Sequence, residues 1–106
     1  MSVQTQPECT VRAEMRVLVS RNGRGDLHDG VHQRLRRVDG VLEVEAVDVS
    51  GLRPGLNDLA VDLVATLRLR PERPDADGDA LAAQLRDGFG VERAEVSVLA
   101  REDRDV

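Results

Sequence analysis

The sequence predicts an α+β domain in which a four-stranded antiparallel sheet carries two helices on one of its faces. Four stretches are predicted to be strands, most of them because apolar and polar residues alternate. Two further stretches are predicted to be helices because an apolar residue recurs at every third or fourth position. All these stretches follow one another in the order strand, helix, strand, strand, helix, strand. With 106 residues, 41 % of them hydrophobic, the chain fits one domain with one core.

The first strand is predicted at residues 11–20, where every second residue is apolar and the residues between are mostly charged. Its inward side chains are Val11, Ala13, Met15, Val17 and Val19. After a polar loop at residues 21–25, Asp26 is placed to cap a helix, because its carboxylate can accept from a first-turn amide. The apolar stripe of that helix is Leu27, Val31, Leu35 and Val38, and Gly40 supplies a left-handed stop.

The second strand is predicted at residues 41–49, followed by a long turn at residues 51–57. Its expected inward residues are Leu42, Val44 and Ala46, and its expected outward residues are Glu43, Glu45 and Val47. The alternation blurs at residues 47–49, which indicates a β-bulge or an edge position. Residues 59–70 alternate most regularly and form the third strand, which ends before Pro71 because proline cannot donate to the ladder.

The second helix is predicted from the three aspartates at positions 75, 77 and 79 and an apolar stripe of Leu81, Leu85 and Phe89. The last strand covers residues 91–100. We expect residues 1–9 to be a disordered N-terminal tail, residues 10–101 to be the single domain, and residues 102–106 to be a charged C-terminal tail. Right-handed crossovers on both strand–helix–strand units then give the ferredoxin-like split βαβ sandwich (βαββαβ).

The composition limits the cellular location and the classes of binding partner that the sequence allows. The net charge is −5, all 15 cationic residues are arginine, and the arginines alternate with carboxylates, which disfavours nucleic-acid binding. RNA-binding domains of this fold also stack bases on aromatics of the central strands, whereas the single aromatic here is expected on a helix. The lone Cys9, the polar N-terminus and the lack of a long apolar run predict a cytoplasmic protein without membrane contact. A GC-rich genome explains the missing lysine better than adaptation to salt, although both can apply.

The sheet face away from the helices must meet water, a ligand or another subunit. From the alternation, its apolar and uncharged members include Leu18, Val64, Thr66 and Leu99, surrounded by charged side chains of both signs. Either this face is solvated and crossed by ion pairs between strands, or it forms an interface. Because the core of so short a chain is small, we expect a homodimer or higher oligomer with these residues in its interface.

A small anionic ligand is a second possibility, at the loop that precedes the first helix. Its candidate contacts are Arg21, Gly23, Arg24 and Gly25, next to the unpaired amides of a helix N-terminus. The loop resembles the anion cradle of acylphosphatases, which occurs at the same place in this fold with a nearby asparagine. That family's glycine–arginine–glutamine signature is absent, however, and Asn57 is expected at the other end of the sheet. Asp26 would also compete for the amides, and a flexible turn accounts for the same glycines.

A metal site is a third possibility. His28 and His32 lie four residues apart on the first predicted helix, so one metal ion could bind both, with Asp26 or Asp29 adding an oxygen. Residues 35–41 resemble the turn into the second strand of heavy-metal-associated modules, but the cysteine pair of those modules is absent. The acidic run at residues 75–79 lacks the glycine and glutamate that a calcium loop requires at its sixth and twelfth positions.

No cofactor and no catalytic pair is indicated, because neither histidine has a nucleophile at a suitable spacing. The sequence therefore predicts a small cytoplasmic domain that dimerises or senses a small ligand, without catalysis. Two alternatives stay open. The protein could bind an anion or phosphate, or act as a cofactor-free enzyme, through residues 21–25, and it could be a structural subunit of a larger assembly.

Overall fold

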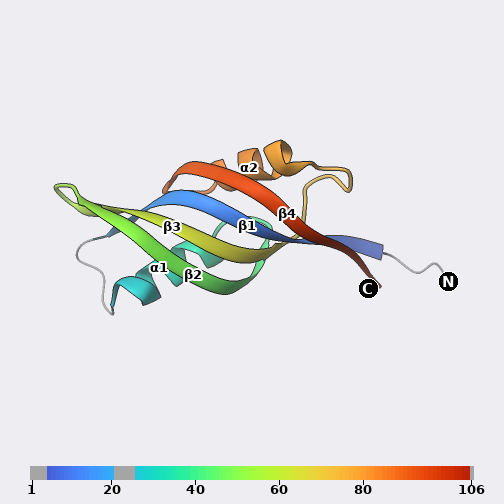
Figure 1. Ribbon diagram of the computed structural model, residues 1–106, viewed down its shortest axis with the longest axis horizontal. Coiled ribbons are helices and arrows are strands. Elements are labelled where there is room, and N and C mark those ends of the chain that lie inside the picture. The colour runs from blue at the N-terminus through green and yellow to red at the C-terminus, as the bar shows by residue number, and fades with distance from the viewer. Residues whose placement is uncertain (1–4, 21–25, 106) are drawn as a thin grey trace.

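The computed structural model describes residues 5–20 and 26–105. Its elements are β1 (Thr5–Ser20), α1 (Leu27–Arg36), β2 (Val41–Pro54), β3 (Asp58–Leu69), α2 (Gly78–Arg86) and β4 (Val91–Asp105). The predicted order of strands and helices is confirmed, and the protein is an α+β domain with a four-stranded antiparallel sheet and two helices (Figure 1).

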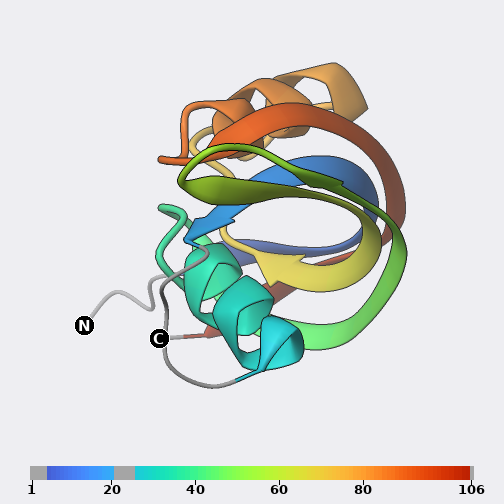
Figure 2. The same ribbon diagram turned by 90° about the vertical axis from the view of Figure 1, so that its left-hand side faces the viewer.

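The strands lie in the order β2-β3-β1-β4, so β1 and β3 are central and β2 and β4 form the edges. Val31 and Leu35 of α1 and Leu81 and Leu85 of α2 belong to one buried cluster with the inward residues of β1 and β3. Both helices therefore cover the same face of the sheet. Helix α1 packs on β1 and β2, whereas α2 packs on β4, and the sheet is strongly curved when seen along its strands (Figure 2).

The central strands show the alternation that the sequence predicts. The odd-numbered residues from Val11 to Val17 and from Val61 to Leu69 are almost fully buried, and the even-numbered residues between them lie on the opposite face. Cross-strand pairs such as Ala13↔Ala65 and Met15↔Leu63 keep the apolar residues of both strands on the helix side. These two strands supply most of the buried core.

The edge strand β2 differs from its predicted facing. Its partly buried positions recur at every third residue, Val41, Val44 and Val47, whereas Leu42 and Ala46 are exposed. The cause is the pairing with β3, whose register shifts between Val41 and Glu43, between Val44 and Ala46, and between Val49 and Gly51. Each bulge adds one unpaired residue and reverses the alternation. The expectation that Leu42 and Ala46 face inward and Val47 outward was therefore wrong.

An aspartate caps each helix: Asp26, which was predicted, and Asp77, which was not singled out as a cap. The Oδ1 atom of Asp26 accepts from the Asp29 amide at 2.8 Å, and Asp77 Oδ1 accepts from the Ala80 amide at 2.8 Å. Helix α2 is shorter than predicted and ends at Arg86. Phe89 therefore belongs to the following turn rather than to the helix, and its side chain is exposed.

The outer strands are longer than predicted. The polar ends were expected to be tails at residues 1–9 and 102–106, yet β1 begins at Thr5 and β4 continues to Asp105. Beyond Cys9, where β3 ends, β1 and β4 keep pairing with each other through Glu8↔Glu102 to Thr5↔Asp105. Backbone hydrogen bonds thus hold segments that have few apolar side chains to bury.

Candidate functional site

The two histidines lie on the first turns of α1. His28 is exposed and His32 is half-buried, beside the apolar stripe of the helix. Their ring centroids are 5.3 Å apart with an interplanar angle of 82°, so the rings meet edge to face. Asp26 Oδ1 is taken up by the helix cap. Within residues 5–20 and 26–105, no group of three or more His, Cys, Asp or Glu side chains is placed to hold a metal ion.

The expected anion contacts Arg21, Gly23, Arg24 and Gly25 lie outside the described residues. Asn57 is placed differently from the prediction. Ser20 pairs with Asp58, so Asn57 lies at the end of the sheet where β1 ends, and not at the opposite end. The reason is the direction of the strands. Both β1 and β2 run antiparallel to β3, so the end of β1 and the β2–β3 turn share one end of the sheet.

The four expected interface residues are spread along the sheet. Leu18, Val64 and Thr66 are half-buried on the outer face of the central strands, next to Ala60, Glu14 and Arg12 respectively. Leu99 is the extra residue of a bulge in β4, beside Thr10 and Val11, and is 57 % exposed. It therefore lies near the beginning of β1, whereas Leu18 lies near the end of that strand.

Charged pairs join the central strands on this outer face. Arg16 Nε donates to Asp62 Oδ1 at 2.8 Å, and a second guanidinium nitrogen, Nη2, donates to Asp62 Oδ2 at 3.3 Å. The hydrogen bond from Arg16 is the main cause that lowers the pKa of the Asp62 carboxyl below its ordinary value. The same contact raises the pKa of Arg16. The pair links β1 to β3 and keeps this part of the face polar.

A second ion group lies at the other end of the same face. Arg68 of β3 lies 3.0 Å from Glu43 of β2 and 3.5 Å from Glu8 of β1, so one cation contacts both neighbouring strands. Glu8 is buried. Ion pairs between strands therefore lie at both ends of this face.

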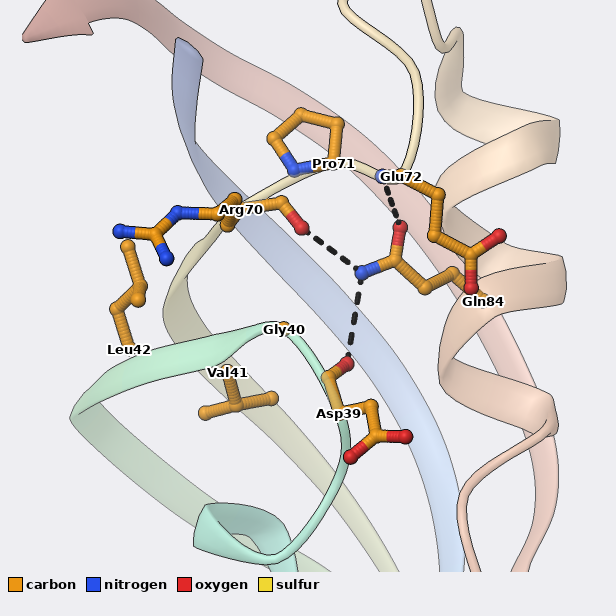
Figure 3. A pocket seen from close by; sticks show the side chains of 8 residues that line it. All are labelled: Asp39, Gly40, Val41, Leu42, Arg70, Pro71, Glu72 and Gln84. Carbon is orange, nitrogen blue, oxygen red and sulfur yellow. Dashed lines mark hydrogen bonds between the residues drawn. The ribbon is translucent and has the colours of Figure 1, made fainter. Parts of the chain in front are cut away.

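A cavity of about 340 Å³ lies where the α1–β2 turn, the end of β3 and α2 meet (Figure 3). The side chain of Gln84, only 6 % exposed, fills its inner wall. Its Nε2 donates to the carbonyl of Arg70 at 3.0 Å and to that of Asp39 at 3.4 Å, and its Oε1 accepts from the Glu72 amide at 3.0 Å. These backbone contacts use the polar groups that a ligand would need, so the cavity is a structural junction.

A further cavity, of about 250 Å³, lies beside the buried Cys9. Arg101 donates to Cys9 Sγ at 3.7 Å and to the Ala76 carbonyl at 2.6 Å. Ser50 donates to the Asp62 carbonyl at 3.1 Å. Neither Cys9 nor Ser50 contacts a general base in these hydrogen bonds, so neither residue is indicated as a nucleophile for covalent catalysis.

Three exposed apolar residues lie towards the end of the sheet where β1 stops, and we call them the end patch: Leu52, Leu56 and Phe89. Leu56 is 96 % exposed, Phe89 84 % and Leu52 50 %. A cavity of about 270 Å³ lies between these turns, and both Phe89 and Asn57, the neighbour of Leu56, line it. Sequence periodicity assigned Phe89 to the core. Its position between Gly88 and Gly90 was the signal that the helix ends before it.

Comparison with known proteins gives no relative: no protein-family model, curated protein or solved structure matches the chain. Neither of the described helices has the length and apolar character needed to cross a membrane. The proposals that follow therefore rest on the geometry above.

Proposed function

We propose that this chain is a ferredoxin-like domain that pairs with a second copy of itself through the end patch, without catalytic activity of its own. The βαββαβ element order and a sheet with β1 and β3 at its centre support the fold. The single buried cysteine, Cys9, supports a cytoplasmic setting.

The main observation in favour of pairing through the end patch is the exposure of Phe89, the only Phe, Tyr or Trp of the chain. Burying a phenylalanine or leucine side chain stabilises a protein by about 1.5–3 kcal/mol. A small domain that leaves Phe89 and Leu56 in water forgoes that gain at two neighbouring turns. Exposed apolar patches bordered by polar residues are typical of interaction sites.

A second copy fits this surface because it carries both signs of charge, with Arg34 and Asp58 lining its cavity. A twofold axis can therefore place the arginine of one copy against the aspartate of the other.

Pairing through the edges of the sheet is disfavoured. The outer strand β2 has three bulges and carries Glu43, Glu45 and Asp48, and β4 has two bulges and many charges. Bulges and charges are the devices that prevent strand addition. A small-molecule ligand is also less well supported, because the cavity of about 270 Å³ at the end patch lies below the usual size of a ligand pocket.

The test uses tryptophan as a reporter, because the chain contains neither tryptophan nor tyrosine. The variant Phe89→Trp then carries the only indole, at the centre of the end patch. We expect its emission to move to shorter wavelength as the protein concentration rises from low to high micromolar, since pairing buries the ring. Adding Leu56→Ser should remove this shift.

The matched control is Leu99→Trp, at an exposed leucine in the other half of the sheet. Its emission should stay that of a hydrated indole at every concentration. If the Phe89→Trp emission does not depend on concentration, or if the control shifts by the same amount, pairing through the end patch is wrong.

A further inference from the structure

The two histidines of α1, which lie outside the end patch, are spaced as two ligands of one metal ion would be. His28 and His32 are the only histidines of the chain, and they lie one helical turn apart. Their ring centroids are 5.3 Å apart. Two imidazoles that bind the same Zn²⁺ through nitrogen at about 2.0–2.1 Å, with a tetrahedral angle, have centroids roughly 5 Å apart. The helix therefore holds the rings at the separation that a shared metal ion requires.

The backbone under the pair is fixed before any metal arrives. Asp26 caps α1, and Val31 and Leu35 anchor the helix in the core between and beyond the two histidines. Binding therefore orders only the two side chains, which lowers its entropic cost. The exposed carboxylate of Asp29 lies in the same first turn and favours a cation, whereas Arg36, one turn after His32, opposes it.

We propose that His28 and His32 form a two-imidazole site for a divalent transition metal such as Zn²⁺, Ni²⁺ or Cu²⁺. Imidazole nitrogen suits these ions, and the hard cations Mg²⁺ and Ca²⁺ prefer oxygen ligands. The two side chains occupy two coordination positions, and water fills the others. Cu²⁺ binds most tightly among the three, following the general order of divalent metals. The metal clamps the first two turns of α1 and stabilises the folded chain.

The experiment is a calorimetric and thermal-shift titration of the full chain with each metal chloride alone. We expect one ion per chain and, at a hundredfold excess over the dissociation constant, a rise in Tm on the order of ten degrees. His28→Gln and His32→Gln should each abolish the rise. The sharper control combines His32→Gln with Gln33→His, which keeps two histidines but moves them off one face of the helix. That variant should also fail to bind the transition metals. Mg²⁺ should not change the Tm of the unaltered protein or of any variant.

A second readout does not depend on the variants. Substoichiometric Cu²⁺ should broaden the NMR ring signals of both histidines in the unaltered protein. The proposal is overturned if Zn²⁺ and Cu²⁺ show no saturable binding, if the shifted-pair variant binds as well as the original, or if only one ring broadens. The association of two copies is measured separately and does not depend on these results.

Discussion

The guanidinium of Arg34 on α1 lies 4.9 Å from the centre of the Phe89 ring in the turn between α2 and β4. A cation–π contact at an exposed site stabilises by about 0.5–1 kcal/mol, less than full burial of the ring would. The contact orients the ring but leaves most of it in water. Phe89 therefore contacts Arg34 at the surface and is not packed into the core of its own chain.

The Gly40 turn is predicted to tolerate no side chain. Gly40 has a φ of 90°, and an added Cβ would overlap Gln84 Nε2 and approach the Arg70 carbonyl to 2.9 Å. Gly90 has a similar φ of 82°, but its Cβ would meet mainly the flexible Arg34 side chain at 3.2 Å. Gly90→Ala should therefore lower the free energy of unfolding by about 1–2 kcal/mol, and Gly40→Ala by about 3 kcal/mol. Urea titration measures both, and equal losses would contradict this account of the turn.

Gln84 is predicted to be a stabilising residue of the junction. Gln84→Ala leaves the Glu72 amide and the carbonyls of Arg70 and Asp39 without this partner, which should lower the unfolding free energy by about 2–4 kcal/mol. The exposed glutamine of α1 provides the control, because Gln33→Ala should change it by less than about 0.5 kcal/mol. Similar values for the two variants in chemical denaturation would show that the junction does not contribute.

The Arg16–Asp62 pair predicts a specific dependence of stability on pH. Arg16 lowers the pKa of Asp62 in the folded protein. The Asp62 carboxylate therefore stabilises the fold at pH values above the ordinary carboxyl pKa of 3.8. This contribution is lost as the pH falls through the lowered native value. Asp62→Asn should therefore lower the Tm by a constant amount from neutral pH down to about pH 5, and the difference should vanish in stronger acid. A difference that persists in acid would mean that the charge of Asp62 is not its cause.

The two capping aspartates should contribute similarly to stability. Asp26→Ala and Asp77→Ala each remove an acceptor for a first-turn amide, and each should lower the unfolding free energy by about 1 kcal/mol. Asp75, which is exposed and precedes the second cap, serves as the control, and Asp75→Ala should have an effect below about 0.5 kcal/mol. If Asp75→Ala is as destabilising as Asp77→Ala, the effect is one of net charge and not of capping.

Local patterns predicted the parts of the fold that depend on local physics. The strict alternation of β3 follows from a strand buried on one face, and the predicted cap at Asp26 follows from amides that the helix itself leaves unpaired. The central role of Gln84 could not be predicted in this way. Its three backbone partners come from segments up to 45 residues away, and nothing in its own neighbourhood marks it.

The candidate surfaces were predicted less well than the core. The facing of β2 depends on three bulges, whereas the alternation of its sequence indicates an irregularity only at residues 47–49. Phe89 fits the apolar stripe of α2 by spacing, yet the helix ends three residues earlier, before Gly88. Asn57 lies at the opposite end of the sheet from the expected one. The antiparallel directions of β1, β2 and β3 place it there, and the predicted topology already contains these directions.

Sedimentation equilibrium of the unaltered protein tests pairing through the end patch most directly. The average mass should rise from 11.6 kDa at low concentration towards twice that value at high micromolar concentration. The double variant Leu56→Ser with Phe89→Ser should remain at the monomer mass with an unchanged Tm, since both side chains are exposed. A monomer mass for the unaltered protein at every concentration, or a double variant that still pairs, would contradict the account.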